Sequence, residues 1–564
     1  MSLYEIYIKQ TRITDHDVDL MREEIKTFKY SPRISIITPV HNVDPIWLEK
    51  AIDSVLSQVY ENWELCLADD ASTKKHIKKI LDKYQNSDDR IKVKYLNENQ
   101  GISGASNEAL SLAKGEFIGL LDHDDELSVN ALFEVVKLLQ DHTDADMVYS
   151  DEDKIDLKNR RSDPYFKPDW SPDLFLSSMY TSHFGVYRRK IIEEIGGFRK
   201  GFEGSQDYDL VLRFTEKTDK IYHIPKILYH WRKVPNSTAV KYEAKGYADV
   251  NARKALGEAL QRRKIDGKVL SGMFPGYFRI KRVIMNEPEI SIIILSKDSI
   301  GQLRKCIESI ENKTNYKNYN IIVVSNNDQT LDYIRSTIKS PNIRNMKFEK
   351  SFNVSLVNNF AAQNTTSEYL VFLNSDTEVI SEEWLFGMLE HAQRKDVGAV
   401  GCKLIYPDMT IHHAGIILGL TGIDEKFEIA GYSDRSIPDS VQGYFGRPNI
   451  IHNVSAIAKE CFMVRRDIFN EVGGFDTDLE NIFIDIDFCL KIRKKGYLIV
   501  YTPYAKLFYH ELIKKVSEKT NMEELSFNNN LKYIREKWGK VIDNGDPYFN
   551  SNLTLDKGEF LVRV

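Results

Sequence analysis

The sequence predicts an α/β protein that contains two similar domains in tandem. Two observations support this fold class. A long segment of the first half recurs in the second half, and in both copies short apolar runs alternate with amphipathic helical patterns. The chain has 564 residues, a length that suits two or three domains.

The repeat extends over more than a hundred residues. The segment from Ser103 to Leu127 (SGASNEALSLAKGEFIGLLDHDDEL) corresponds to the segment from Ser355 to Val379 (SLVNNFAAQNTTSEYLVFLNSDTEV). Matching positions within it are 107 and 359, and 124 and 376, both 252 residues apart. Further matches follow in the same order: GGF at 196–198 and 473–475, QDYDL at 206–210 with IDIDF at 484–488, and YH at 229–230 and 509–510. We interpret this pattern as a duplicated domain.

Apolar runs in each copy predict a largely parallel sheet. In the first copy they predict strands at 34–40, 63–70, 91–96 and 117–122, with helices near 47–58 and 132–139. In the second copy the corresponding strands are expected at 290–295, 319–325 and 369–374.

The domain boundaries follow from these patterns. We expect an N-terminal extension of about one helix at 1–32, a first domain at 33–240 and a charged helical connector at 241–287. The second domain is expected at 288–520, followed by a C-terminal helical tail at 521–564. In this tail Leu531, Ile534 and Trp538 are spaced to pack back onto a domain.

Composition narrows the class of protein. The formal net charge of -6 argues against nucleic acid as a partner. The five cysteines are scattered without CxxC spacing, which favours a reducing compartment. No apolar run approaches the roughly 18 residues of a membrane span. We therefore expect a cytoplasmic protein, and the sequence leaves open whether it sits at the inner face of the cell membrane.

Ligands of open α/β sheets bind at the carboxyl ends of the strands, so polar residues there are candidates for binding. Asp70 follows the second strand of the first copy. Its carboxylate can accept a hydrogen bond from a base or a ribose, or it can cap the next helix. The local pattern does not decide between these two roles.

An acidic cluster follows the fourth strand. Asp122, Asp124 and Asp125 lie within four residues, and like charges this close destabilise one another unless a cation binds. Mg²⁺ or Mn²⁺ suits such carboxylates together with phosphate oxygens. The alternative is a solvated acidic loop, although Asp376 stands at the matching place in the second copy.

Two further features contain titratable groups. Asp207 and Asp209 lie at the start of a predicted helix, two positions apart, so they face different directions. One is expected to reach the site while the other supports the backbone. His230 and its matching residue His510 follow late apolar runs, and either a structural or a ligand role is open for both.

At these residues the chain resembles the family 2 glycosyltransferases, over about 33–240 and 288–515. The motifs GSQDYDL, YHWR, IYPDMTIHHAG, GYFGR and GGFD are similar to those of tandem transferases that build bacterial surface polysaccharides such as O-antigen, capsule or cell-wall glycan. The resemblance implies two tandem GT-A domains, which are Rossmann-like domains of the nucleotide-diphospho-sugar transferase type.

The resemblance also implies roles for individual residues. The nucleotide-binding residues would be Thr38, His41, Asp70, Asn107, Asn326 and Asn359. The ligands of a Mn²⁺ or Mg²⁺ cofactor would be Asp122, Asp124, Asp125, His230, Asp376 and His510. The general bases would be Asp207 and Asp485.

The sequence departs from the family pattern in ways that bear on these roles. Gln206 and Ile484 replace the Glu that usually precedes the base. In the second copy Asn374 replaces one metal carboxylate, and Asn326 replaces the base-reading Asp. A second site that binds metal weakly, or that is inactive, therefore remains open.

The second copy carries about 25 extra residues, around 406–455. Loops grafted on a scaffold often carry specificity, so we expect an acceptor-binding insertion, with a plain surface elaboration as the alternative. The acceptor-binding candidates are His412, His413, Tyr444 and Arg447.

The expected function is a bifunctional, metal-dependent inverting transferase. It would move sugars from UDP- or dTDP-sugar donors to a growing surface polysaccharide, with a lipid-linked oligosaccharide as acceptor and a peripheral contact with the membrane. One alternative is a single active domain beside a non-catalytic glycan- or nucleotide-binding domain. A nucleotidyltransferase is disfavoured because no glycine-rich basic loop follows the first strand.

Overall fold

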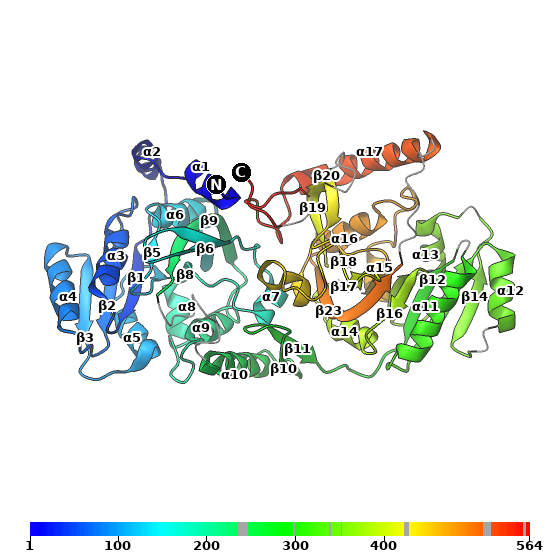
Figure 1. The fold of residues 1–564 in the computed structure, drawn as a ribbon, viewed down its shortest axis with the longest axis horizontal. Coiled ribbons are helices and arrows are strands. Elements are labelled where there is room, and N and C mark those ends of the chain that lie inside the picture. The colour runs from blue at the N-terminus through cyan, green and yellow to red at the C-terminus, as the bar shows by residue number, and fades with distance from the viewer. Residues whose placement is uncertain are drawn as a thin grey trace.

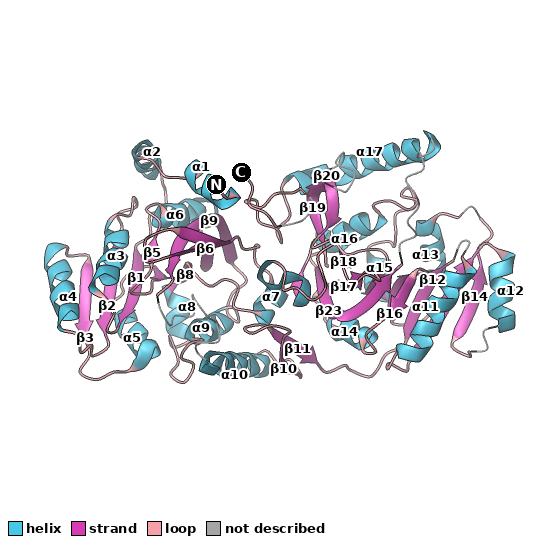
Figure 2. Cartoon of the chain, in the orientation of Figure 1, coloured by secondary structure: helices cyan, strands magenta, loops and turns pink. Residues whose placement is uncertain are grey.

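The computed structural model describes residues 1–234, 246–296, 299–337, 340–350, 352–421, 428–510, 521–556 and 560–564. The chain forms two lobes, each built around one large mixed sheet (Figure 1). We call them the first and the second domain. Strands form the middle of each lobe and most helices lie outside them (Figure 2).

The first sheet has nine strands in the order β3-β2-β1-β4-β8-β6-β9-β5, with β7 paired to β6. Their bounds are β1 (Ile34–Val40), β2 (Trp63–Asp69), β3 (Ile91–Tyr95), β4 (Phe117–Leu120), β5 (Glu126–Leu127), β6 (Met147–Ile155), β7 (Arg161–Tyr165), β8 (Gly185–Arg188) and β9 (Ile221–Arg232). β1 to β4 are parallel to one another, whereas β8 runs antiparallel to both of its neighbours.

Helices cover both faces of this sheet, which explains why β1 and β2 are buried along nearly their whole length. On one face the core contains α3 (Pro45–Leu56), α4 (Lys75–Ser87) and α6 (Ala131–Asp141). On the other face it contains α5 (Gly101–Leu110), α7 (Pro172–Ser177), α8 (Arg189–Glu194) and α9 (Gln206–Phe214).

The second sheet repeats this order as β14-β13-β12-β15-β22-β17-β23-β16, with β18 and β21 added at its side. Its strands are β12 (Ile290–Leu295), β13 (Tyr319–Ser325), β14 (Ile343–Lys347), β15 (Tyr369–Asn374), β16 (Thr377–Val379), β17 (Val397–Ile405), β18 (Ile411–His413), β21 (His452–Asn453), β22 (Cys461–Arg465) and β23 (Leu498–Tyr509). Its helices are α11 (Ile300–Lys313), α12 (Asp328–Thr337), α13 (Val354–Gln363), α14 (Trp384–Ala392), α15 (Arg466–Glu471) and α16 (Ile484–Lys494). The shared strand order confirms the duplication.

The predicted strands are confirmed closely. In the second copy the three expected strands coincide with β12, β13 and β15, and in the first copy the predicted ends differ by two residues at most. Fully buried strands of a parallel sheet produce continuous apolar runs, and such runs are easy to delimit in a sequence.

The N-terminal extension contains two helices where one was expected. α1 (Leu3–Gln10) and α2 (Asp15–Ile25) each begin with a capping box, formed by Ser2 with Glu5 and by Thr14 with Asp17. The second capping box starts a new helix because the Thr14 side chain accepts a hydrogen bond from the backbone N–H of Asp17.

The connector contains the expected helix, α10 (Gly246–Arg262), and an unexpected hairpin of β10 (Gly267–Ser271) and β11 (Phe278–Arg282). The first five residues of the predicted connector lie outside the described residues. α10 packs into the core of the first domain, and Arg279 of the hairpin forms an ion pair with Glu390 of α14 in the second. The connector therefore contacts both domains.

The C-terminal tail also joins the two domains. α17 (Asn521–Asp543) buries Ile534 and Trp538 against the second domain, as predicted. The chain then crosses to the first domain, where the buried Asn550 amide donates hydrogen bonds to the Asp151 carboxylate at 2.8 and 3.1 Å. The two chain termini consequently lie near each other between the lobes (Figure 1).

Candidate active sites at the strand ends

The carboxyl ends of β1, β2 and β4 meet at one edge of the first sheet because these strands are parallel neighbours. The loop after β4 folds back over this edge, where the His123 ring nitrogen Nδ1 lies 2.9 Å from the Pro39 carbonyl oxygen. Thr38, near the end of β1, is buried and its hydroxyl has no hydrogen-bond partner in the described chain. A ligand at this edge would meet an unsatisfied hydroxyl.

Asp70 does not cap the helix that follows it, because α4 begins without a side-chain cap. Its Oδ1 atom accepts a hydrogen bond from the backbone N–H of Gln100, in front of α5, at 2.6 Å. His41 lies beside it, with Nδ1 2.9 Å from the Asp70 carbonyl oxygen. The hydrogen bond from Gln100 occupies one carboxylate oxygen, so the other is left for a second partner such as a base or a ribose.

The acidic loop after β4 divides into two parts. Asp125 is 1% exposed and accepts hydrogen bonds from the Tyr229 hydroxyl (2.6 Å) and the Arg232 backbone N–H (2.7 Å). Both of its oxygens are used to hold β9, so this geometry contradicts a ligand role for Asp125. Asp122 and Asp124 remain half-buried at the edge, where burial raises the pKa of Asp124.

His230 has the arrangement typical of a ligand histidine. Its Nδ1 atom lies 2.6 Å from the Asp153 carboxylate. Asp153 is fully buried, and its carboxylate also accepts hydrogen bonds from the Tyr4 hydroxyl of α1 and from the Arg161 side chain. A histidine oriented through one nitrogen by a carboxylate presents the other nitrogen to a metal or a phosphate.

Asp207 and Asp209 have different surroundings. Asp209 is fully buried and forms ion pairs with Arg199 and Arg213, which fix the start of α9. Asp207 reaches the strand-end edge instead. Burial, with a smaller contribution from the nearby Asp122 carboxylate, raises the pKa of Asp207 to about 6.

His183 is a site residue that the sequence analysis missed. It lies in the loop before β8, and its ring stacks on Tyr229 with centroids 4.6 Å apart. Its charge lowers the pKa of Asp207, which places it beside the proposed base. No motif marks this histidine, and only the pairing of β8 with β4 brings it to the edge.

Asn107 and Asn359 bind backbone, and this geometry contradicts the predicted contact with the nucleotide. The Asn107 amide donates to the Phe198 carbonyl oxygen and accepts from the Phe198 N–H, both at 2.8 Å. Asn359 makes the same pair with Phe475 at 2.8 and 2.9 Å. These amides hold the GGF turns, which explains why both features recur together.

The second sheet forms a corresponding edge. Asn326 is exposed directly after β13, and Asp376 follows β15. Asp485 is the second residue of α16, where it accepts a hydrogen bond from the Lys459 N–H at 3.3 Å. Burial raises the pKa of Asp485. Asp487, like Asp209, is structural because the Trp538 indole N–H donates to it at 2.8 Å.

A second missed residue is Glu460. The strand registers match Arg188 with Arg465, so Glu460 occupies the position that His183 has in the first domain. It is 4% exposed, and burial, with smaller contributions from the Asp485 and Asp376 carboxylates, raises the pKa of Glu460 to about 7. The second edge thus carries three neighbouring carboxylates.

The sheet register contradicts the match of His510 with His230. Glu126 of β5 pairs with His230, whereas the equivalent Glu378 of β16 pairs with Phe508. His510 lies two residues beyond, where its ring nitrogen Nε2 is 3.2 Å from a Glu378 carboxylate oxygen. The Tyr-His sequence recurs, but β9 and β23 reach the edge with different registers.

The two histidines of the insertion are core residues, which contradicts their predicted contact with an acceptor. His412 is 3% exposed and stacks on Tyr509, and its Nδ1 lies 2.9 Å from the Tyr406 hydroxyl. His413 is fully buried and accepts from the backbone N–H of Gly415 at 3.2 Å. Burial lowers the pKa of His412 to about 2 and that of His413 to about 3, so both are neutral.

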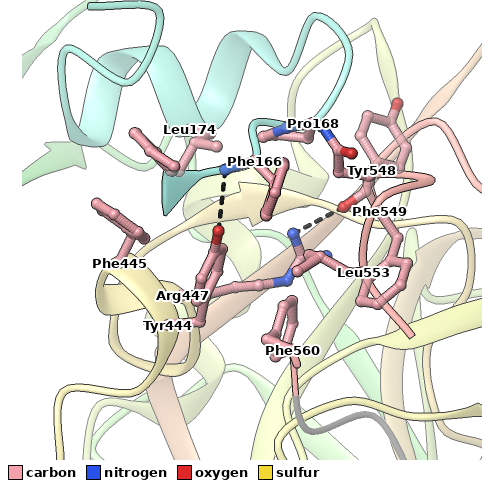
Figure 3. A pocket seen from close by; sticks show the side chains of 12 residues that line it. Phe166, Pro168, Leu174, Tyr444, Phe445, Arg447, Tyr548, Phe549, Leu553 and Phe560 are labelled. Carbon is pink, nitrogen blue, oxygen red and sulfur yellow. Dashed lines mark hydrogen bonds between the residues drawn. The ribbon is translucent and has the colours of Figure 1, made fainter. Parts of the chain in front are cut away.

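Tyr444 and Arg447 lie between the two domains, which contradicts the same prediction for them. The Tyr444 hydroxyl accepts a hydrogen bond from the backbone N–H of Phe166 at 2.9 Å, and Arg447 donates to the Tyr548 carbonyl oxygen at 2.7 Å (Figure 3). The cavity beside them has a volume of only about 20 Å³ and is lined mostly by apolar side chains. This space is too small for a sugar, so the insertion serves the domain interface here.

A family comparison identifies what the two domains have in common. The model of glycosyl transferase family 2 matches residues 35–196 and 291–473, which together cover more than half of the chain. The chain belongs to glycosyl transferase family 2. Both domains have the GT-A fold, in agreement with the two sheets of equal strand order.

Relatives of this family match nearly the whole chain. The y4gI protein of Sinorhizobium fredii is 40% identical over 96% of this chain and 60% of that protein. The O-antigen biosynthesis protein RfbC of Myxococcus xanthus is 34% identical over 95% of this chain and 42% of its own length. This chain therefore spans about half the length of these two relatives.

Among solved structures, residues 1–349 of S. aureus TarS in complex with UDP-GlcNAc align with a TM-score of 0.32 at 21% identity. That alignment covers 41% of this chain and 72% of the TarS chain. Within the described ranges, the helices of this chain are too short or too polar to span a lipid bilayer.

Two side chains of the first domain have the chemistry to bind a divalent cation. Asp122 and Asp124 supply hard carboxylate oxygens, and Mg²⁺ typically takes one or two carboxylates together with phosphate oxygens. In the described part of the chain no three His, Cys, Asp or Glu side chains are grouped so as to hold a metal by themselves. A cation bound by these two carboxylates would therefore need further ligands from a bound molecule or from water.

Proposed function

We propose that this chain is a bifunctional inverting glycosyltransferase that extends a surface polysaccharide from UDP- or dTDP-sugar donors. The observation that carries this proposal is the paired placement of Asp207 and Asp485. Each lies at the start of an equivalent helix, Asp207 half-buried and Asp485 buried, and desolvation raises the pKa of both. The name of the O-antigen relative supports the assignment to polysaccharide synthesis.

In the proposed reaction the acceptor hydroxyl oxygen attacks the anomeric carbon while the bond from this carbon to the diphosphate oxygen breaks. Asp207, or Asp485 in the second domain, takes the hydroxyl proton, and the nucleoside diphosphate leaves. A general base works best when its pKa lies near the operating pH, and burial moves the pKa of Asp207 in that direction, to about 6.

The remaining residues of the first site bind and orient the donor. Thr38 and Asp70 would hold the nucleotide, and Asp122, Asp124 and His230 would surround the diphosphate. A divalent cation bound there would offset the negative charge of the leaving diphosphate. We propose that this cation, either Mn²⁺ or Mg²⁺, is a cofactor of the first site.

The acceptor in this proposal is a lipid-linked oligosaccharide at the inner face of the cell membrane, as the family resemblance implies. The four insertion residues first considered for its binding lie in the core or between the domains. The open strand-end edges beside Asp207 and Asp485 are therefore the places where we expect the acceptor hydroxyl to enter.

A second candidate function is one active domain beside a non-catalytic glycan- or nucleotide-binding domain. The observation that favours it is the loss of metal-binding groups in the second domain, where Asn374 and Phe508 replace Asp122 and His230. The two candidate functions predict different results for Asp485. A bifunctional enzyme needs Asp485 for one of its transfers, whereas an enzyme with one active domain does not need it for any transfer.

The test measures nucleoside diphosphate release from a panel of UDP- and dTDP-sugars with Mn²⁺ and a lipid-linked acceptor. Wild type is compared with Asp207→Asn, Asp485→Asn and the double variant. We expect each single variant to retain turnover of one donor and the double variant to have none. If Asp485→Asn changes nothing, the second domain is a binding module; if wild type consumes no donor, the proposal fails.

A further inference from the structure

We propose that the second domain binds the diphosphate of its nucleotide through the Lys459 ammonium and without a divalent metal. This inference rests on the proposed function, because it assumes that a nucleoside diphosphate group enters the second edge. It assigns different chemistry to the two sites of one chain: a metal-assisted site in the first domain and a lysine-assisted site in the second.

The second domain has lost the groups that would hold a metal. By strand register Asn374 replaces Asp122, and Phe508 replaces His230. Asp376 is then the single acidic residue left in the loop after β15 that corresponds to the first-domain motif. An amide and a phenyl ring are poor replacements, because Mg²⁺ and Mn²⁺ prefer charged oxygen ligands and imidazole nitrogen is a further ligand for Mn²⁺.

The same edge of the second domain carries a lysine, Lys459, that has no counterpart in the first domain. The register that matches Arg188 with Arg465 also matches Ser182 with Lys459. Lys459 is half-buried and lines a cavity together with Asn374, Ser375 and Asp376. Its charge lowers the pKa of both Asp485 and Glu460, which places the ammonium among the acidic groups of the site.

The ammonium is held in position before any ligand binds. Lys459 Nζ donates to the Asn481 carbonyl oxygen at 2.6 Å and to its side-chain oxygen at 3.2 Å. A lysine ammonium has three N–H donors, so one remains for a phosphate oxygen. A pre-positioned donor loses less side-chain entropy on binding than a free lysine would.

The formal charges of the two sites agree with this exchange. In the first domain two carboxylates, Asp122 and Asp124, would be balanced by one divalent cation. In the second domain the loop after β15 keeps one carboxylate, Asp376, and Lys459 supplies one ammonium beside it, while Glu460 and Asp485 add carboxyl groups to the same edge. The ammonium thus offsets part of the acidic charge that a diphosphate would meet at this edge, and it does so without a metal.

The cavity is large enough to admit such a group. It has a volume of about 230 Å³, several times the roughly 30 Å³ that a water molecule occupies. Polar groups gather at Asn374, Asp376 and Lys459, while Phe372 and Phe462 contribute apolar wall. A charged group would bind at the polar end, beside the ammonium.

The experiment measures binding of UDP and dTDP to the full chain by isothermal titration calorimetry, in Mn²⁺ and in EDTA. We expect two equivalents of nucleotide to bind in Mn²⁺ and one in EDTA. The EDTA-resistant equivalent should survive in the double variant Asp122→Asn/Asp124→Asn. It should weaken about tenfold to a hundredfold in Lys459→Met, the range expected for a hydrogen bond to a charged group.

Two controls separate binding from folding. Lys459→Arg keeps the positive charge and should retain most of the EDTA-resistant affinity. If Lys459 acted only as a structural contact to Asn481, keeping the charge would not by itself preserve nucleotide affinity. Lys495→Met removes an exposed lysine that pairs with Glu471, and it should leave binding unchanged. Thermal unfolding of each variant verifies that the second domain is folded.

The outcomes distinguish this inference from the proposed function. If EDTA removes both equivalents, or if Lys459→Met binds as wild type does, the lysine-assisted site is wrong while the transferase proposal stands. If the nucleotide binds as expected but no donor is transferred, the transferase proposal fails and the binding site stands. If neither nucleotide binds under any condition, both are wrong.

Discussion

His183 in the first domain and Glu460 in the second occupy the same structural position, five residues before the arginine that pairs with the start of the fourth parallel strand. The position lies beside the proposed base in both domains, but it carries an imidazole in the first domain and a carboxyl group in the second. His183 lowers the pKa of Asp207, whereas Glu460 adds a carboxylate next to Asp485. The two sites therefore differ in how their bases titrate.

Replacing His183 by Gln should move the acid limb of first-site activity to higher pH. Burial raises the pKa of Asp207 to about 6, and the His183 charge opposes this rise, so its removal raises the pKa further. The measurement is kcat/KM against pH between 5 and 9 in the Asp485→Asn background. His142→Gln, at a ring stacked on Tyr222 near the opposite end of β9, serves as the control. An unmoved acid limb in His183→Gln would contradict the assignment.

Replacing Glu460 by Gln should stabilise the protein at alkaline pH. Burial raises the pKa of Glu460 to about 7, so the folded state favours the protonated form. The stability that this preference contributes is complete below the ordinary pKa of about 4.5 and is lost as pH rises through 7. Gln resembles the protonated form and should recover up to about 3 kcal/mol above pH 8.

The thermal midpoint of wild type and Glu460→Gln, measured at pH 5 and pH 8.5, checks this prediction. The two proteins should differ little at the lower pH, and the variant should melt higher at the upper pH. Glu382→Gln, at a solvent-exposed position, controls for the general effect of removing a carboxylate. Equal midpoints at pH 8.5 would show that ionisation of Glu460 does not destabilise the folded state.

Removing Arg394 should destabilise the contact between the domains. Arg394 of the second domain pairs with Asp173 of the first, and Asn453 donates to the same carboxylate at 2.8 Å. Burial alone would raise the pKa of Asp173, but the Arg394 charge outweighs it and lowers this pKa to about 2. Arg394→Ala leaves a buried carboxylate without its cation, which typically costs about 3–5 kcal/mol.

Differential scanning calorimetry of Arg394→Ala should show a lower midpoint at pH 7 than wild type. Because the pKa of Asp173 is depressed, the stabilisation is present above pH 4 and disappears as pH falls towards 2, so the two proteins should converge in acid. Arg304→Ala removes an exposed pair with Glu308 and should change little. A similar loss in both variants would contradict the interface argument.

Replacing Asn107 by Ala should lower stability and leave nucleotide affinity nearly unchanged. The variant loses two hydrogen bonds to the Phe198 backbone, and it leaves the partner groups unsatisfied at a cost of about 1–3 kcal/mol. Asp70→Ala provides the contrast, since it removes a carboxylate at the nucleotide edge. Denaturant unfolding and UDP titration of both variants test this. A selective loss of affinity in Asn107→Ala would restore its predicted role.

Much of the fold follows from local patterns in the sequence. The duplication, the strands at 290–295, 319–325 and 369–374, and the helix starts that carry Asp207 and Asp485 were all predictable. Buried parallel strands require continuous apolar runs, and helix starts and strand ends place polar groups at fixed points along the chain. These constraints act over a few residues, so they remain visible without the tertiary structure.

The tertiary structure decided which polar groups have partners and where the chain segments meet. The insertion residues His412 and Tyr444 have the chemistry of a binding site, but packing places one in the core and the other between the domains. Sheet register separates His510 from His230, and pairing of β8 and β22 brings His183 and Glu460 to the sites. Register, burial and long-range pairing depend on distant segments, and a local sequence pattern does not contain them.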